Sequence, residues 1–141
     1  MNLFDYRRRE TGEVQIGGKP LGGNHPIRVQ SMTNTSTMDT EACVAQTLRI
    51  AEAGGDYVRL TTQGVREAEN LRNINAGVRA AGCAVPLVAD VHFNPKVADV
   101  AALYAEKVRI NPGNYVDAAR TFKHLAVSYT HLRAHETRSN L

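Results

Sequence analysis

Four short apolar runs alternate along the chain with longer stretches whose apolar residues recur every three or four positions. The runs are rich in strand-forming residues and lie at 26–33, 57–62, 85–93 and 107–111. The helical stretches between them lie at 40–53, 65–81 and 96–105. Because strands that alternate with helices are joined by right-handed crossovers, this order predicts an α/β fold with a parallel sheet.

Local signals support these elements. Asp39 is a suitable N-cap for the first helix, Gly54 a suitable end for it, and Pro95 a suitable first residue for the third helix. Ahead of the first strand, glycines bracket a strand-turn-strand pattern, so we expect a β-hairpin at about 13–23. We interpret this hairpin as a plug or lid on the main fold.

The parallel sheet fits two architectures, an open doubly wound sheet and part of a (β/α)₈ barrel, which periodicity alone does not separate. The chain has 141 residues, whereas a complete barrel usually needs ~250. The barrel interpretation therefore predicts a partial TIM barrel of about four βα units.

Polar side chains gather in the second half of each predicted strand. Residues two apart in a strand point to the same side, which pairs Arg59 with Thr61, Asp90 with His92, and Arg109 with Asn111. The first strand carries Gln30, Ser31 and Thr33 at the same end. Barrel enzymes keep their sites at the carboxyl ends of strands, and burying an unpaired charge is costly, so these strands require either mutual pairing or a charged ligand.

Two readings of these residues stay open. In a purely structural reading, Arg59 forms a salt bridge with Asp90 and His92 is hydrogen-bonded in the core. In a functional reading, Arg59 and Arg109 bind an anion, and the turn at 111–114 directs backbone N–H groups toward it. The coincidence on four strands favours the functional reading.

The charge balance narrows the class of ligand. The formal net charge is +3, with 13 arginines against four lysines, which favours bidentate contacts with phosphate or carboxylate and is too small to indicate nucleic acid. We find no signal peptide and no membrane span, so a cytoplasmic location is expected. Cys43 and Cys83 lack the spacing of metal ligands, and we expect no metal site in this chain.

Four motifs, in this order, resemble the 4-hydroxy-3-methylbut-2-enyl diphosphate synthase family (IspG/GcpE). They are VQSMTNTSTMDT at 29–40, YVRLTT at 57–62, PLVADVHFNPKVA at 86–98 and KVRINPGN at 107–114. The resemblance covers residues 2–125, and the segment 62–75 is similar to the three-domain form of the family. It implies that residues 1–125 are the N-terminal part of a TIM-barrel substrate-binding domain.

The resemblance also implies an activity, the reductive conversion of 2-C-methyl-D-erythritol 2,4-cyclodiphosphate to 4-hydroxy-3-methylbut-2-enyl diphosphate in the non-mevalonate isoprenoid pathway. In the family, electrons from ferredoxin or flavodoxin pass through a [4Fe-4S] cluster held by a C-terminal domain, and we expect the full-length enzyme to be a homodimer. The roles implied for this chain are diphosphate binding by Arg59 and Arg109, hydrogen bonds from Asn111 and Asn114, and a place in the same mouth for Asp90 and His92. Asp90 and His92 are the candidates for proton transfer.

The iron–sulfur domain and the cluster ligands are missing from this chain, so we expect it to be inactive alone. Residues 126–141 differ in composition from the rest, and VSYTHLRAHET within them resembles a translated sequencing adaptor, which predicts a non-native tail. A zinc site at His131 and His135 is not expected, because no third ligand is evident. Two alternatives remain: another phosphate-binding barrel, such as a pterin-binding synthase-like enzyme, and an inert truncated half-barrel.

Overall fold

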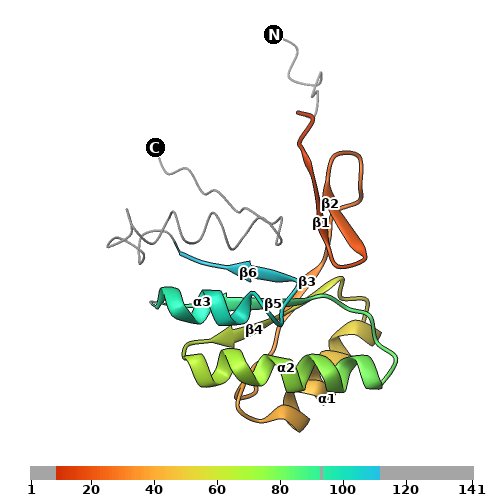
Figure 1. Cartoon of the computed structure of the whole chain (residues 1–141). Helices are drawn as coiled ribbons and strands as arrows, with labels where there is room; N and C mark the ends of the chain where they lie inside the picture. The colour runs from red at the N-terminus through yellow and green to blue at the C-terminus, as the bar shows by residue number, and fades with distance from the viewer. Residues whose placement is uncertain (1–8, 93, 112–141) are drawn as a thin grey trace.

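The computed structural model describes residues 9–92 and 94–111, and its centre is a four-stranded parallel sheet in the order β3-β4-β5-β6 (Figure 1). The strands are β3 Gln30–Met32, β4 Tyr57–Thr62, β5 Leu87–Val91 and β6 Lys107–Arg109. Each strand is hydrogen-bonded to the strand that follows it in the sheet. The predicted α/β order with a parallel sheet is therefore confirmed.

Three helices connect these strands: α1 Thr40–Glu52, α2 Val65–Ala80 and α3 Pro95–Ala101. Asp39 and Asn94 cap the N-termini of α1 and α3 with their side chains, which satisfies backbone N–H groups that a helix leaves unpaired. Gly54 and Gly82 follow α1 and α2 at φ angles of 93° and 77°, a conformation that glycine adopts without strain. The ends of these helices are thus set by local chemistry.

The helices lie on one face of the sheet, and the apolar core fills the space between them (Figure 1). Val58 and Leu60 of β4 are fully buried in this core, together with Leu71 of α2. The residues that alternate with them on β4 point to the opposite face. A doubly wound sheet carries helices on both faces, whereas a barrel carries them only outside, so the described residues form part of an open barrel wall.

The predicted hairpin is also present. β1 Glu13–Ile16 pairs antiparallel with β2 Lys19–Gly22, and Ile16 is fully buried against Tyr57 and Val88. Lys19 Nζ lies 2.8 Å from Asp56 Oδ1, and Tyr57 Oη donates a hydrogen bond of 2.8 Å to the Lys19 carbonyl oxygen. Because Asp56 and Tyr57 stand at the start of β4, the hairpin packs against the amino ends of the strands.

The first strand is shorter than the sequence pattern predicts, and the bounds 26–33 are wrong. Only Gln30–Met32 form β3, while Ile27 and Val29 are 79% and 59% exposed. The Asp56 carboxylate accepts the N–H of Val29 at 2.9 Å, so this group is not available to a strand ladder. Among the described residues β3 also has a single neighbour in the sheet, which leaves its outer edge uncovered.

Three later elements are shorter than predicted as well. β5 covers 87–91 instead of the predicted 85–93, and residue 93 lies outside the described residues. β6 covers 107–109 instead of the predicted 107–111. β6 is short because it pairs with β5 over three residue pairs only. α3 ends at Ala101 instead of residue 105, because the N–H groups of Leu103 and Tyr104 donate to carbonyls three residues back, a tighter turn than that of an α-helix.

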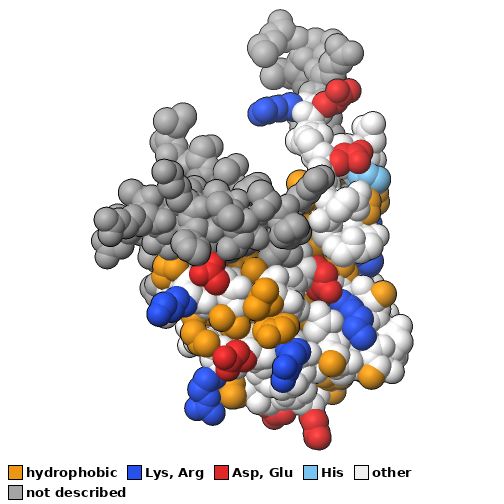
Figure 2. Space-filling model, viewed as in Figure 1, with side chains coloured by type: hydrophobic (Ala, Val, Ile, Leu, Met, Phe, Trp, Pro, Cys, Tyr) orange, Lys and Arg blue, Asp and Glu red, His pale blue; other side chains and the backbone are white. Residues whose placement is uncertain are grey.

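Acidic and basic side chains are interspersed with apolar ones on the face that Figure 2 shows, without a large patch of one sign. None of the described helices is long and apolar enough to cross a membrane.

Two isoleucines, Ile16 buried beneath the hairpin and Ile27 exposed after it, should contribute differently to stability. Ile16→Ala should lower the free energy of unfolding by about 2–5 kcal/mol, because it leaves a cavity beneath the sheet, whereas Ile27→Ala should cost less than about 0.5 kcal/mol. Urea unfolding of both variants measures the difference. Equal losses would contradict the exposed position of Ile27.

Candidate active site

Three charged side chains meet at the carboxyl ends of β4, β5 and β6, on the face of the sheet away from the helices. Asp90 lies opposite Thr61 of β4 and opposite Arg109 of β6 in the strand register. Arg59 lies on the same side of β4 as Thr61, two residue pairs closer to the amino end. The register of three strands therefore brings Arg59, Asp90 and Arg109 together.

Asp90 is the centre of this cluster, with 1% of its side chain exposed. Its Oδ2 accepts hydrogen bonds from Arg59 Nε at 3.0 Å and Nη2 at 2.6 Å, and its Oδ1 accepts one from Arg109 Nη1 at 2.8 Å. His92 Nε2 lies 3.3 Å from Asp90 Oδ2. The carboxylate is buried, while the side chains of Arg59, His92 and Arg109 are 27%, 32% and 33% exposed.

This geometry fixes the charge of the site. Burial by itself raises the pKa of Asp90, but hydrogen bonds from Arg109 and Arg59 and their positive charges outweigh it, so the pKa lies below its usual value. Asp90 is therefore ionised at neutral pH. Two guanidinium groups against one carboxylate leave one positive charge in excess, and the partly exposed guanidinium groups present it to the open face of the sheet, an arrangement suited to an anion.

The structure brings together four of the predicted site residues, namely Arg59, Asp90, His92 and Arg109. Asn111 follows β6 at the same end and is exposed, while Asn114, the tail at 126–141 and the histidines within it lie outside the described residues. The Arg59–Asp90 salt bridge of the structural reading is present as well. The structural and the functional reading are compatible. The salt bridge with Asp90 orients Arg59 but does not use all of its N–H groups, so the others can bind an anion.

The sequence analysis assigned no role to the loop at 33–39 between β3 and α1. The N–H of Thr33 donates to the carbonyl of Arg59 at 2.9 Å, and Thr37 Oγ1 donates to the carbonyl of Thr61. The loop thus contacts the backbone of both mouth-facing residues of β4. Its composition of threonine, asparagine and serine was the available signal, because such side chains often bond to nearby backbone groups.

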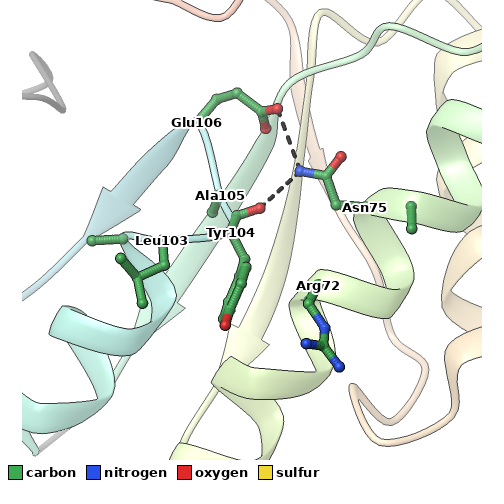
Figure 3. A pocket seen from close by; sticks show the side chains of 8 residues that line it. Arg72, Asn75, Leu103, Tyr104, Ala105 and Glu106 are labelled. Carbon is green, nitrogen blue, oxygen red and sulfur yellow. Dashed lines mark hydrogen bonds between the residues drawn. The ribbon is translucent and has the colours of Figure 1, made fainter.

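Two hollows occupy opposite ends of the sheet. One of about 650 Å³ lies beside the loop and the start of α2, and is lined by Met38, Gln63, Gly64, Val65, Arg66 and Glu67. The other, of about 470 Å³, is shown in Figure 3 and lies at the amino end of β6. There Glu106 is already bound by Arg79 Nη2 at 2.6 Å and by the N–H of Leu87 at 2.7 Å. Only the first hollow adjoins the carboxyl ends of the strands.

The described residues do not fit an iron–sulfur cluster. No group of three or more His, Cys, Asp or Glu side chains lies close enough within 9–92 and 94–111 to hold a metal ion. Cys43 is buried, which raises the pKa of its thiol, and its Sγ donates to the Ser36 carbonyl at 3.2 Å. A buried thiol of raised pKa is a poor source of the thiolate that such a cluster needs.

The sequence of this chain matches a known protein family over most of its length. Residues 11–134 match the GcpE TIM-barrel domain. The chain belongs to this family. The match extends past residue 125, where the resemblance noted from the sequence ends, and the non-native tail at 126–141 stays a prediction.

Curated relatives of this chain share one name. Over 125 residues, 89% of this chain, it is 79% identical to a protein of Bacteroides thetaiotaomicron and 59% identical to one of Parabacteroides distasonis. Both are named 4-hydroxy-3-methylbut-2-en-1-yl diphosphate synthase (flavodoxin). The chain spans 20% of the length of each.

Among solved structures, the chain is similar to a dihydropteroate synthase of Xanthomonas albilineans, with a TM-score of 0.53 and 25% identity. The similarity covers 77% of this chain and 46% of that one. The pterin-binding synthase anticipated as a rival thus shares the fold. The far higher identity to the diphosphate synthases favours those relatives over it.

The depressed pKa of Asp90 predicts a pH-dependent contribution to stability. A carboxyl whose pKa is lower in the folded state stabilises the fold above its unfolded pKa, near 3.8, and loses that contribution as the pH falls through the folded value. Asp90→Asn should lower the free energy of unfolding at neutral pH by about 1–3 kcal/mol, because the arginines lose a charged acceptor. Urea unfolding from pH 7 to 2 should show this difference shrinking below about pH 4; a difference independent of pH would contradict the ion cluster.

Proposed function

We propose that this chain is the N-terminal part of the substrate-binding barrel of a 4-hydroxy-3-methylbut-2-en-1-yl diphosphate synthase, and that the cluster at the strand ends binds the diphosphate of 2-C-methyl-D-erythritol 2,4-cyclodiphosphate. The observation that carries the proposal is the pair Arg59 and Arg109, held by one buried carboxylate at the mouth of a GcpE-family barrel. The names of the relatives support the product and flavodoxin, and the substrate is the one that the family resemblance implies.

The arginines are the binding groups in this proposal. Each guanidinium gives part of its donor set to Asp90, and each retains N–H groups that can meet phosphate oxygens. Asp90 holds both planes at fixed positions, so little side-chain freedom remains to be lost when the substrate binds. Asn111, and the predicted contribution of Asn114, add hydrogen bonds from the segment after β6.

Asp90 and His92, the two candidates for proton transfer, differ in their surroundings. Asp90 is buried and ionised, with both oxygens engaged by arginines, so it cannot donate a proton and acts by positioning. His92 is partly exposed, and its Nε2 faces the same carboxylate at 3.3 Å. A histidine beside a carboxylate can deliver a proton to a leaving oxygen, and we assign that role to His92.

We propose that the redox step uses a part of the enzyme outside this chain. The described residues do not fit a [4Fe-4S] cluster, and the chain spans 20% of the length of the relative from Bacteroides thetaiotaomicron, so the proposed cluster site lies in the remainder of such an enzyme. Flavodoxin, which the relatives' names give, is the proposed electron donor. Dimerisation, a three-domain organisation and a cytoplasmic location stay predictions, and the chain alone is expected to be inactive.

The direct experiment is a full-length enzyme in which residues 2–125 of this chain replace the matching segment of the Bacteroides thetaiotaomicron relative. Assayed without oxygen and with reduced flavodoxin, this chimera should convert the cyclodiphosphate to the linear diphosphate. Failure of a folded, cluster-loaded chimera to do so, beside an active parent enzyme, would sink the proposal. A pterin substrate tested in parallel addresses the rival function.

Arg109→Met in this chimera should weaken binding of the cyclodiphosphate roughly 10- to 100-fold, because a charged, bidentate donor to phosphate is lost. Arg72→Met is the matched control, since Arg72 is exposed on α2 at the opposite end of the sheet and should change affinity less than about twofold. Isothermal titration calorimetry measures both. Similar losses in the two variants would point to a general charge effect instead of a site.

A further inference from the structure

The loop at 33–39 connects the site to the helices behind the sheet. At its start, the N–H of Thr33 donates to the carbonyl of Arg59 at 2.9 Å. Further on, Thr37 Oγ1 donates to the carbonyl of Thr61. Both acceptors belong to the residues of β4 whose side chains face the mouth. The loop therefore holds the backbone from which the Arg59 side chain extends.

Two side chains on the helices hold the loop in turn. Asn70 of α2 donates from Nδ2 to the carbonyl of Thr37 at 2.8 Å and lies 3.0 Å from Thr40 Oγ1. Gln46 of α1 accepts the N–H groups of the loop residues Asn34 and Thr35 at 3.1 and 3.3 Å. Side chains of both α1 and α2 therefore hold the loop by hydrogen bonds.

We propose that Asn70 is a positioning residue for diphosphate binding: from outside the sheet it fixes Thr37, Thr37 fixes the carboxyl end of β4, and this places Arg59 against Asp90. The inference rests on the proposed function of the cluster. Asn70 touches no substrate in this account. It acts through a hydrogen bond to the backbone carbonyl of Thr37, so a side chain of the same size without this donor should not position the loop.

The same helix offers a matched control. Asn75 donates from Nδ2 to the carbonyl of Tyr104, also at 2.8 Å, and lies beside the hollow at the amino end of β6 (Figure 3). Asn70→Ala and Asn75→Ala therefore both remove an amide donor on α2 that is bonded to a backbone carbonyl, at opposite ends of the sheet. Each variant also loses side-chain hydrogen bonds, with Thr40 and Asn73 for Asn70 and with Glu106 for Asn75.

The test uses the full-length chimera and two ligands, the cyclodiphosphate substrate and inorganic diphosphate. Asn70→Ala should raise KM for the substrate and Kd for inorganic diphosphate roughly five- to tenfold, with kcat within about twofold, because the arginines are misplaced while the reacting groups remain. Asn70→Asp, which keeps the size of the side chain but loses the Nδ2 donor, should change KM, Kd and kcat in the same way as Asn70→Ala. Asn75→Ala should leave KM, kcat and Kd within about twofold, although both alanine variants lower Tm.

The outcomes separate this proposal from the function it rests on. An unchanged Kd for inorganic diphosphate in Asn70→Ala, or equal effects of Asn70→Ala and Asn75→Ala, would overturn the positioning role even if the substrate is turned over normally. Absence of substrate turnover in the unmutated chimera would overturn the proposed function, while the comparison of diphosphate affinities would still decide the role of Asn70. A loss confined to Tm would make Asn70 a structural residue only.

Discussion

A single buried carboxylate sets the arrangement of the strand ends. Asp90, with 1% of its side chain exposed, is stable as an anion only because Arg59 and Arg109 bind both of its oxygens. Asp90 and its two partners stand on three neighbouring strands, so the ion cluster and the strand register support each other. The same contacts orient two partly exposed guanidinium groups toward the open face. Because two guanidinium groups share one carboxylate, one positive charge remains in excess.

The two ends of the sheet perform different tasks. At the amino ends, Ile16 of the hairpin is buried, Asp56 pairs with Lys19, and Glu106 pairs with Arg79, so these carboxylates meet cations within the fold. At the carboxyl ends, two arginines share the single buried carboxylate of Asp90. We therefore assign stability to the amino ends and the proposed ligand binding to the carboxyl ends, as in barrel enzymes, and the hollow of Figure 3 is a poor candidate for the site.

The spacing of two residues along each strand was sufficient to predict that Arg59, Asp90 and Arg109 converge, because side-chain alternation in a parallel sheet is a local property. The start of α1 was predictable for the same reason, since Asp39 caps the helix that directly follows it. The short first strand was not, because it depends on Asp56, a residue distant in sequence that takes the N–H of Val29. The role of Asn70 likewise comes from a contact across 33 positions of the chain, which no local pattern reveals.

Binding of the substrate's diphosphate by the two arginines that Asp90 holds can be observed at the arginines themselves. The measurement is nitrogen-15 NMR of the arginine side chains in the full-length chimera, during titration with 2-C-methyl-D-erythritol 2,4-cyclodiphosphate. We expect the Nε resonances of Arg59 and Arg109 to shift until the site is saturated, while that of Arg79, which is bound to Glu106 at the other end of the sheet, stays in place. Saturable binding without movement of the Arg59 and Arg109 resonances would contradict it.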